Sequence, residues 1–225
     1  MTNTSTSAGN RGGPAGSGVA YLLRYEGALK RVADIILAIL LLPMLLPIIG
    51  LLYLIIRSDG GPGFFGHKRV GREGKIFKCW KLRSMVPDAE EHLREHLANN
   101  PAAAAEWERD FKLRDDPRIT RLGAFIRKTS LDELPQIWNV LRGEMSLVGP
   151  RPVTSDELSR YGAHQWAYLM MRPGVTGLWQ VSGRNDISYD ERVALDTRYC
   201  REVSAVQDAI ILFNTIGAIT KRTGV

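Results

Sequence analysis

The stretch VADIILAILLLPMLLPIIGLLYLII, residues 32–56, decides the fold of this 225-residue chain. It carries a single charged side chain, Asp34, and is long enough to cross the hydrocarbon core of a bilayer as a helix. A signal-peptide core is shorter and precedes a small-residue cleavage pattern, so we expect this segment to remain in the protein. A buried core helix of a soluble protein is the less favoured alternative, because such helices rarely run this far without polar positions.

Two features of the stretch indicate a helix that enters the bilayer, bends and returns. Basic residues lie at both ends, with Lys30 before it and Arg57 after it, and basic flanks prefer the cytoplasmic side. Pro43 and Pro47 stand in the middle, and each removes a backbone donor and clashes with the preceding turn. We therefore predict a re-entrant helix over about residues 30–57, broken at the prolines, and keep a spanning helix as the alternative.

The composition is that of an ordinary globular protein with a basic balance. Hydrophobic residues make up 44% and charged residues 24%, which excludes wholesale disorder and fibrous classes. Thirty Lys and Arg against 24 Asp and Glu give a net charge of +6, which suits anionic lipid and phosphate-bearing partners. The two cysteines, Cys79 and Cys200, are too few and too far apart for a disulfide scaffold.

The chain divides into three predicted parts. Residues 1–18 are small and polar and predict a disordered tail. Residues 19–57 form the membrane anchor, and residues 58–225 form one domain at the cytoplasmic surface of the membrane. The predicted fold class is α+β and predominantly helical: a re-entrant membrane helix, a small β-hairpin and a compact helical domain.

The segment after the anchor predicts the hairpin and then a helical insert. Strands over residues 64–70 and 75–82 flank a glycine-containing turn. Residues 88–112 are rich in helix-forming and charged residues, and Pro101 predicts a division into two short helices.

Asp132 and Glu133 lie in the chemically densest part of the sequence. Ser130 and Glu133 fit a capping box, and Pro135 suits a first helical turn, so both carboxylates can be purely structural. Alternatively, a helix start binds phosphate, and two adjacent carboxylates can hold Mg²⁺. The residues that follow recur at helical spacing and predict one buried face: Leu134, Ile137, Trp138 and Leu141.

Cations surround this acid pair in the sequence. Five lie within a short span and two come from the hairpin: Arg118, Arg121, Arg127, Lys128, Arg151, Lys81 and Arg83. An acid pair among guanidinium groups is what a site for diphosphates requires. Arg151 follows a Gly-Pro pair and precedes another proline, and such a stiff turn limits the freedom lost on binding.

Four stretches together resemble the bacterial sugar transferase family, whose small monotopic members are polyprenyl-phosphate phosphoglycosyl transferases. They are KRVADIILA (30–38), FFGHKRVGREGKIFKCWKLRSM (64–85), RKTSLDELPQIWNVLRGEMSLVGPRP (127–152) and RPGVTGLWQVSGRND (172–186). The similarity runs from about Lys30 nearly to the C-terminus. It implies a re-entrant helix broken at a proline, a compact cytoplasmic active site and a UDP-sugar as donor.

The resemblance also assigns roles to residues. The family's Asp-Glu dyad falls on Asp132 and Glu133, which become the catalytic residues and the ligands of Mg²⁺. Its helix-breaking proline falls on Pro47, although Leu46 stands where relatives often carry serine, and Pro43 can compensate. We expect seven side chains to bind the substrates: Lys81, Arg83, Arg118, Arg127, Lys128, Arg151 and Arg184.

The activity implied is two-step transfer of a sugar phosphate at the cytoplasmic face of the bacterial inner membrane. Asp132 attacks the β-phosphorus of the UDP-sugar and expels UMP, and polyprenyl (undecaprenyl) phosphate then takes the sugar phosphate from the aspartate. This is the first membrane step of exopolysaccharide, O-antigen or glycoconjugate synthesis. The insert over 88–112 resembles members that transfer hexose-1-phosphate, which favours galactose or glucose over acetamido sugars. The expected partners are the UDP-sugar, polyprenyl phosphate and the lipid bilayer, without nucleic acid; a homo-oligomer is left open.

Two other functions compete with this one. A basic membrane-tethered protein that binds anionic lipid or nucleic acid without catalysis explains the charge equally well, but leaves Asp132 and Glu133 opposing the phosphates. A conventional glycosyltransferase would move the sugar alone and release UDP, but the sequence shows no βαβ nucleotide-binding pattern.

Overall fold

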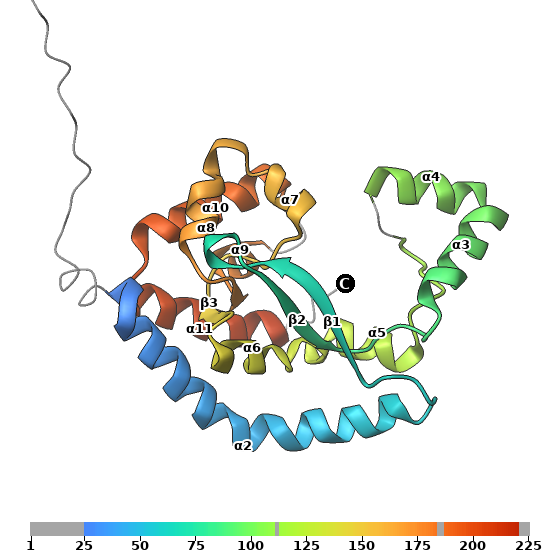
Figure 1. Ribbon diagram of the computed structural model, residues 1–225, viewed down its shortest axis with the longest axis horizontal. Coiled ribbons are helices and arrows are strands. Elements are labelled where there is room, and N and C mark those ends of the chain that lie inside the picture. The colour runs from blue at the N-terminus through green and yellow to red at the C-terminus, as the bar shows by residue number, and fades with distance from the viewer. Residues whose placement is uncertain (1–24, 111–112, 184–186, 221–225) are drawn as a thin grey trace, which may run out of the picture.

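A computed structural model of the protein describes residues 25–110, 113–183 and 187–220 (Figure 1). The predicted tail over 1–18 and Arg184 lie outside the described residues. The longer elements are α2 (Lys30–Arg57), β1 (Phe64–Val70), β2 (Ile76–Leu82), α3 (Ala89–Asn99), α4 (Pro101–Asp110), α5 (Arg121–Lys128), α6 (Gln136–Arg142), α10 (Tyr189–Glu202) and α11 (Ala205–Thr220). The shorter elements are η1 (Tyr25–Leu29), η2 (Arg72–Gly74), η3 (Leu131–Glu133), β3 (Ser146–Val148), α7 (Ser155–Ser159), η4 (Gly162–His164), α8 (Gln165–Met170), β4 (Gly174–Thr176) and α9 (Leu178–Ser182). The predicted α+β, mostly helical class is confirmed.

Helix α2 is a single 28-residue helix that bends in its middle, the part that contains Pro43 and Pro47 (Figure 1). Proline lacks the backbone donor that would close the helix there, which is a sufficient cause for the bend. By length and composition it is the one helix of the described residues that could cross a membrane. Leu40, Leu51 and Leu54 on its outer surface are 61–68% exposed, whereas the rest of the molecule lies on its concave side (Figure 1).

The N-terminal end of α2 is fixed to the domain by buried polar contacts. The Lys30 ammonium pairs with the carboxylate of Asp208 on α11, and both side chains are buried. Arg31 donates to two carbonyls at the carboxyl end of α6, at 2.6 and 3.0 Å, where a helix leaves such groups unpaired. One turn further on, Asp34 accepts from the Ser146 hydroxyl at 3.1 Å.

The C-terminal end of α2 is fixed to the same domain by Arg83, at the end of the hairpin. The buried guanidinium donates to the carbonyls of Ile56 and Pro62 at 3.1 and 2.6 Å, and to Oδ1 of Asp59 at 2.5 Å. Arg83, which the sequence places among the substrate-binding cations, is thus engaged in holding the anchor. Both ends of the bent helix are therefore attached to one folded unit.

The predicted hairpin is confirmed, with β1 and β2 antiparallel and Phe64 opposite Leu82. A second, parallel pair, β3 and β4, was not predicted, because strands of three residues are too short for a periodic pattern. The prediction of a common buried face on α6 is wrong for Trp138, which is 50% exposed. Asn139 is buried instead, because its side chain bonds the backbone of β2.

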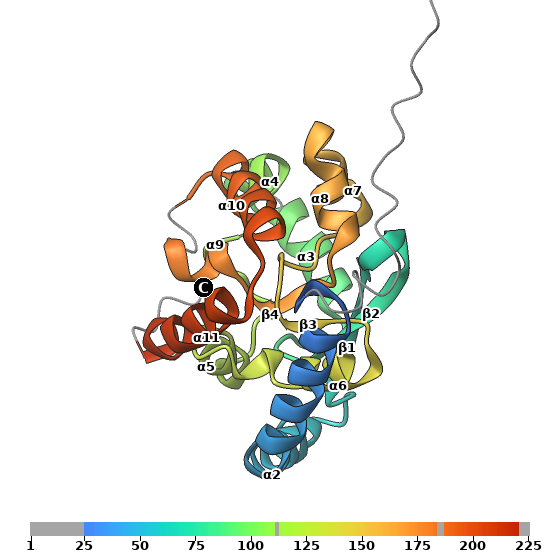
Figure 2. The ribbon, with the colours of Figure 1, turned by 90° about the vertical axis from the view of Figure 1, so that its left-hand side faces the viewer.

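Two features lie toward the edges of the molecule. The predicted division at Pro101 is confirmed: α3 and α4, here called the arm, project to one side of the molecule (Figure 1). Figure 2 shows α11 and α6 beside α2 at the edge of the domain that the anchor occupies. Helix α11 buries Ile211 but exposes a row of apolar side chains: Val206, Ile210, Phe213 and Ile216.

Candidate active site

Asp132 and Glu133 lie in the short 3₁₀ helix η3, directly after a strained residue. Ser130 has φ +58°, the left-handed region that costs a non-glycine residue about 1–2 kcal/mol. Its side chain makes no capping hydrogen bond, so the predicted capping box does not form. Glu133 reaches a cation instead, and Asp132 is buried at 7% exposure. Strained backbone and a buried carboxylate together are typical of functional sites.

Lys81 of β2 lies over both carboxylates. Its Nζ is 2.6 Å from Oε1 of Glu133 and 3.6 Å from Oδ2 of Asp132. Burial raises the pKa of the Asp132 carboxyl; the charge of Glu133 adds to this, while Lys81 and Arg127 oppose it. Burial alone would lower the pKa of Lys81, but the two carboxylates outweigh it and the pKa rises. The ammonium therefore stays charged and compensates the acid pair.

Arg127, in the last turn of α5, is the second cation of the pair. Its charge lowers the pKa of the Asp132 carboxyl, which places the guanidinium within electrostatic reach. Its Nη1 atom is buried and has no hydrogen-bond partner in the part of the chain that the structure describes. Such a group costs about 1–3 kcal/mol unless an acceptor arrives, and a phosphate oxygen is a suitable acceptor.

The remaining predicted cations divide into engaged and available groups. Arg118 forms a fork with Asp116, with Nε at 2.8 Å and Nη2 at 2.6 Å, so its guanidinium is engaged as that of Arg83 is. The Arg151 guanidinium lies 5.7 Å from the Trp179 ring, a cation–π distance. Lys128 and Arg121 are exposed on α5.

An apolar pocket of about 220 Å³ leads from the acid pair to the membrane helix. Its lining includes Ser130 and Glu133, next to Asp132, and Leu41 and Leu45 of α2. The lining between them comes from α6, α11 and the β3–α9 region: Leu134, Ile137, Leu147, Val175, Thr176, Gln180, Val181, Leu212 and Thr215. A ligand with a polar head and an apolar chain can therefore place its head at Glu133 and its chain in the pocket.

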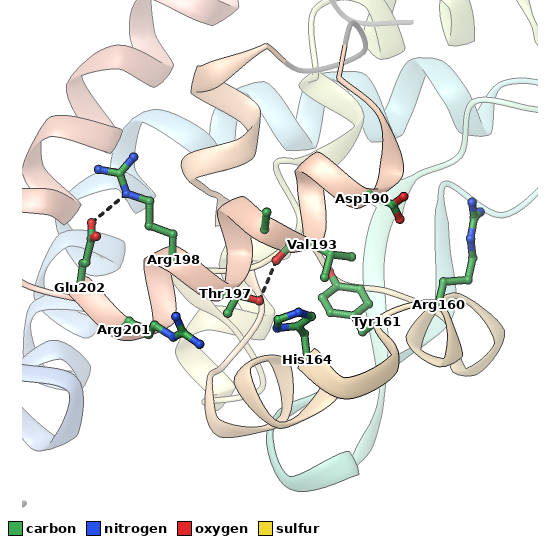
Figure 3. A pocket seen from close by; sticks show the side chains of 10 residues that line it. Arg160, Tyr161, His164, Asp190, Val193, Thr197, Arg198, Arg201 and Glu202 are labelled. Carbon is green, nitrogen blue, oxygen red and sulfur yellow. Dashed lines mark hydrogen bonds and ion pairs between the residues drawn. The ribbon is translucent and has the colours of Figure 1, made fainter.

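A larger groove of about 470 Å³ lies between α10 and the α7–α8 region (Figure 3). None of the predicted site residues that the structure describes lines it. One ion pair among its lining residues lies at the surface: Arg198 pairs with Glu202 at 3.0 Å, with both side chains more than half exposed. The size of a cavity therefore does not identify the site in this molecule.

The acid pair fits a hard cation only together with a ligand. No group of three or more His, Cys, Asp or Glu in the described ranges could hold a metal ion. Asp132 and Glu133 supply carboxylate oxygens, and the Lys81 ammonium shows that a cation lies between them. Mg²⁺ commonly binds through one or two carboxylates plus substrate phosphates, so these residues suit Mg²⁺ bound along with a diphosphate.

Three residues that shape the site are not identified as site residues by the sequence analysis. Asp116 engages Arg118, and its Asp-Pro-Arg context is a turn signal that the sequence does contain. Asn139 accepts from Trp80 N at 3.0 Å and donates to the Lys78 carbonyl at 2.7 Å, holding the Lys81 strand on α6. A polar residue within an apolar helix face is the signal for it. The left-handed Ser130 has no sequence signal, because serine rarely adopts it.

The features of the molecule that bear on its class are a bent apolar helix, a buried aspartate beside cations, and an apolar pocket lined by residues of both regions. The model of the bacterial sugar transferase family matches residues 25–222, and the chain belongs to that family. The resemblance stated from the sequence is thereby confirmed.

Individual relatives agree with this assignment. The chain is 56% identical over 196 residues to the undecaprenyl-phosphate galactose phosphotransferase of Salmonella typhimurium and, to the same extent, to the UDP-galactose-lipid carrier transferase of Erwinia amylovora. These matches cover 87% of the chain but only 41% of either relative, so the chain spans about two fifths of their length. The exopolysaccharide production protein ExoY of Sinorhizobium fredii is 50% identical over 199 residues, 88% of each chain.

Proposed function

We propose that this protein is a phosphoglycosyl transferase that moves a hexose-1-phosphate, foremost galactose-1-phosphate, from a UDP-sugar to polyprenyl phosphate. The observation that carries the proposal is the buried Asp132 beside Lys81 and Arg127, joined by an apolar pocket to α2. The Salmonella and Erwinia relatives, both 56% identical, are named for galactose and for UDP-galactose.

In the first step, an oxygen of Asp132 forms a bond to the β-phosphorus of the donor, and the bond from that phosphorus to the bridging oxygen breaks. UMP leaves with the oxygen, and the sugar phosphate stays on the aspartate. Arg127 donates its unpartnered Nη1 to the phosphate, and Lys81 keeps Asp132 ionised for attack. Asp132 and Glu133, together with the diphosphate, would hold Mg²⁺, which would supply charge neutralisation.

In the second step, a phosphate oxygen of polyprenyl phosphate attacks the same phosphorus, and the bond to Asp132 breaks. The product is a polyprenyl-diphosphate-sugar, and the carboxylate is restored. The 220 Å³ pocket suits the first part of the isoprenoid chain, because Leu45, Ile137 and Leu212 line it. Its rim at Glu133 would hold the acceptor phosphate next to the aspartate.

The attachment of α2 supports a re-entrant anchor. Lys30 and Arg83 fix its two ends to one domain, and a folded domain lies on one side of a membrane. Both ends then lie on that side, and the bend turns the helix back within the bilayer. Basic flanks favour the cytoplasmic side, which supports a domain at the cytoplasmic face of the inner membrane.

Nucleotide release tests the proposed reaction. Purified protein is supplied with Mg²⁺, undecaprenyl phosphate and a panel of UDP-sugars, and the released nucleotide is identified. We expect UMP with UDP-galactose, and a mass increase of one hexose phosphate on Asp132 when the acceptor is omitted. Release of UDP would indicate ordinary glycosyl transfer, and absence of any nucleotide from every hexose donor would contradict the proposal.

Cysteine labelling tests the arrangement of the anchor. Ala28→Cys and Ser58→Cys place thiols just outside the two ends of α2, and both positions are exposed. The native Cys79 and Cys200 are buried and free, so background labelling should be low. A membrane-impermeant reagent should modify both new thiols from the cytoplasmic side only. Labelling of one of them from the opposite side would establish a spanning helix.

A further inference from the structure

The arm is rooted between the two elements that bring cations to Asp132. Two backbone hydrogen bonds, of 2.9 and 3.2 Å, join residues 84–86 after β2 to residues 118–120 before α5. The contact is close enough that a Cβ on Gly123 would lie 1.9 Å from the Ser84 carbonyl oxygen. Because β2 carries Lys81 and α5 carries Arg127, this clamp fixes the strand and the helix relative to each other.

Arg118 connects the arm to the clamp. Its carbonyl accepts one of the clamp hydrogen bonds, and its guanidinium binds both oxygens of Asp116 at 2.8 and 2.6 Å. The face of the same guanidinium lies 5.1 Å from the ring of Trp107, on α4 of the arm. The side chains of Arg118 and Asp116 are 11% and 6% exposed, so the pair is shielded from solvent screening.

The clamp also fixes the helix that carries the cation of the active site. Helix α5 begins directly after the clamped residues, with Thr120 as its N-cap, and Arg127 lies in its last turn. Arg127 also keeps a buried Nη1 without a hydrogen-bond partner in the described ranges. A guanidinium on a helix whose start is fixed in this way can present that donor to a phosphate at one defined position.

We propose that Asp116 and Arg118 are positioning residues for Arg127, and that Trp107 extends this support into the arm. The arm is then mechanically connected to the guanidinium that meets the donor. This inference rests on the proposed function only in assigning a phosphate to Arg127. A displacement of about 1 Å at a reacting centre can reduce the rate a hundredfold. Small shifts of residues 84–86 or 118–120 should therefore have a measurable effect on the rate.

The test measures the energetic coupling of Arg118 and Trp107 to Arg127. Arg118→Lys keeps the charge but loses the fork and the stacking surface, and Trp107→Ala removes the aromatic support alone. Inorganic pyrophosphate is the probe, and its affinity is measured by calorimetry in nanodiscs, together with kcat and KM for the UDP-sugar and the unfolding temperature. We expect each variant to bind pyrophosphate about tenfold more weakly, with Trp107→Phe within about twofold of the parent protein.

Non-additivity distinguishes positioning from a general loss of structure. Arg127→Lys alone should weaken pyrophosphate binding, and adding Arg118→Lys to it should cause little further loss, because both act through one group. Arg94→Lys, on the exposed side of the arm, is the matched control and should change nothing. If Arg118→Lys unfolds, Trp107→Ala in both Arg127 backgrounds decides the question.

Two outcomes would overturn the inference. Unchanged pyrophosphate affinity in folded Trp107→Ala and Arg118→Lys would separate the arm from the site, and fully additive losses would show that neither acts through Arg127. Because pyrophosphate binding needs no turnover, coupling without UMP release would leave the positioning inference intact while the proposed reaction fails.

Discussion

Two concave regions of the described residues differ in size and in the burial of the charged groups beside them. The groove beside α10 is about 470 Å³ and contains three arginines, but its ion pair of Arg198 with Glu202 is exposed to screening solvent. The pocket beside Asp132 is less than half that volume, yet it lies next to a buried carboxylate with Lys81 3.6 Å away, and Arg127 nearby has a buried nitrogen without a partner among the described residues. A buried carboxylate next to cations, rather than volume, distinguishes this region.

The largest effect should come from removing the charge at the centre of that region. Asp132→Asn should lower turnover by about 10³-fold or more and abolish the covalent adduct, because an amide cannot form the phosphosugar bond. The variant should unfold at the same or a higher temperature, because burying a carboxylate is unfavourable. Asp156→Asn, an exposed acid on α7, is the matched control. Turnover within tenfold of the parent protein would remove Asp132 as the nucleophile.

Removal of the compensating cation should have the next largest effect. Lys81→Met should reduce kcat/KM by about 10²-fold, in the range known for single electrostatic donors. Lys81 lowers the pKa of Asp132, so its loss should raise that pKa and move the acidic limb of the pH–rate profile to higher pH. Lys78→Met changes an exposed lysine on the same strand and is the control. An unshifted acidic limb would show that the 3.6 Å contact does not tune the aspartate.

The parts of the fold that the sequence predicts are those with local signals. An apolar run with Pro43 and Pro47 is sufficient for a long bent helix, and Pro101 is sufficient to divide the insert. The acid pair was also visible, but two interpretations were open until the backbone at Ser130 excluded the capping box. The family resemblance favours the catalytic interpretation, and a periodic pattern does not distinguish between the two.

The fate of individual arginines could not be predicted in the same way. Arg83 and Arg127 look alike in sequence, since each is a cation close to other motif residues. In the structure, the Arg83 guanidinium donates to the Ile56 carbonyl and to Asp59. The Arg127 Nη1 atom is also buried, but it has no hydrogen-bond partner among the described residues. Which acceptors a guanidinium meets depends on tertiary packing, on which sequence spacing has no bearing.

Asp196 sharpens the comparison, because it is a buried acid close to the larger groove. Burial raises its pKa to about 7, while the Tyr161 hydroxyl at 2.8 Å and the charges of Arg192 and Arg151 oppose the shift. The folded protein then holds a proton that the unfolded chain has lost between pH 4 and 7, so stability should fall as pH rises through that window. The slope approaches about 1.4 kcal/mol per pH unit.

Urea unfolding across that window tests the prediction. Asp196→Asn should remove most of the slope while kcat at fixed pH changes by less than about threefold, because the residue is structural. Asp190→Asn, an exposed acid on the same helix, should leave the slope unchanged. Parallel stability curves for the parent protein and Asp196→Asn would show that Asp196 is ionised throughout, and the burial argument would fail there.

Mutations in the larger groove should have the smallest effect on the kinetic constants. A large effect there would contradict the comparison between the two regions. Arg198→Ala removes an exposed pair worth at most about 1 kcal/mol, and Arg201→Ala removes a cation–π contact at 5.8 Å with the partly exposed Trp166. The double variant should therefore keep kcat and KM for the UDP-sugar within about twofold, with a modest fall in unfolding temperature. A tenfold change in either kinetic constant, in a variant that remains folded, would place the groove in the reaction. The burial of charged groups would then be no better a guide to this site than cavity size.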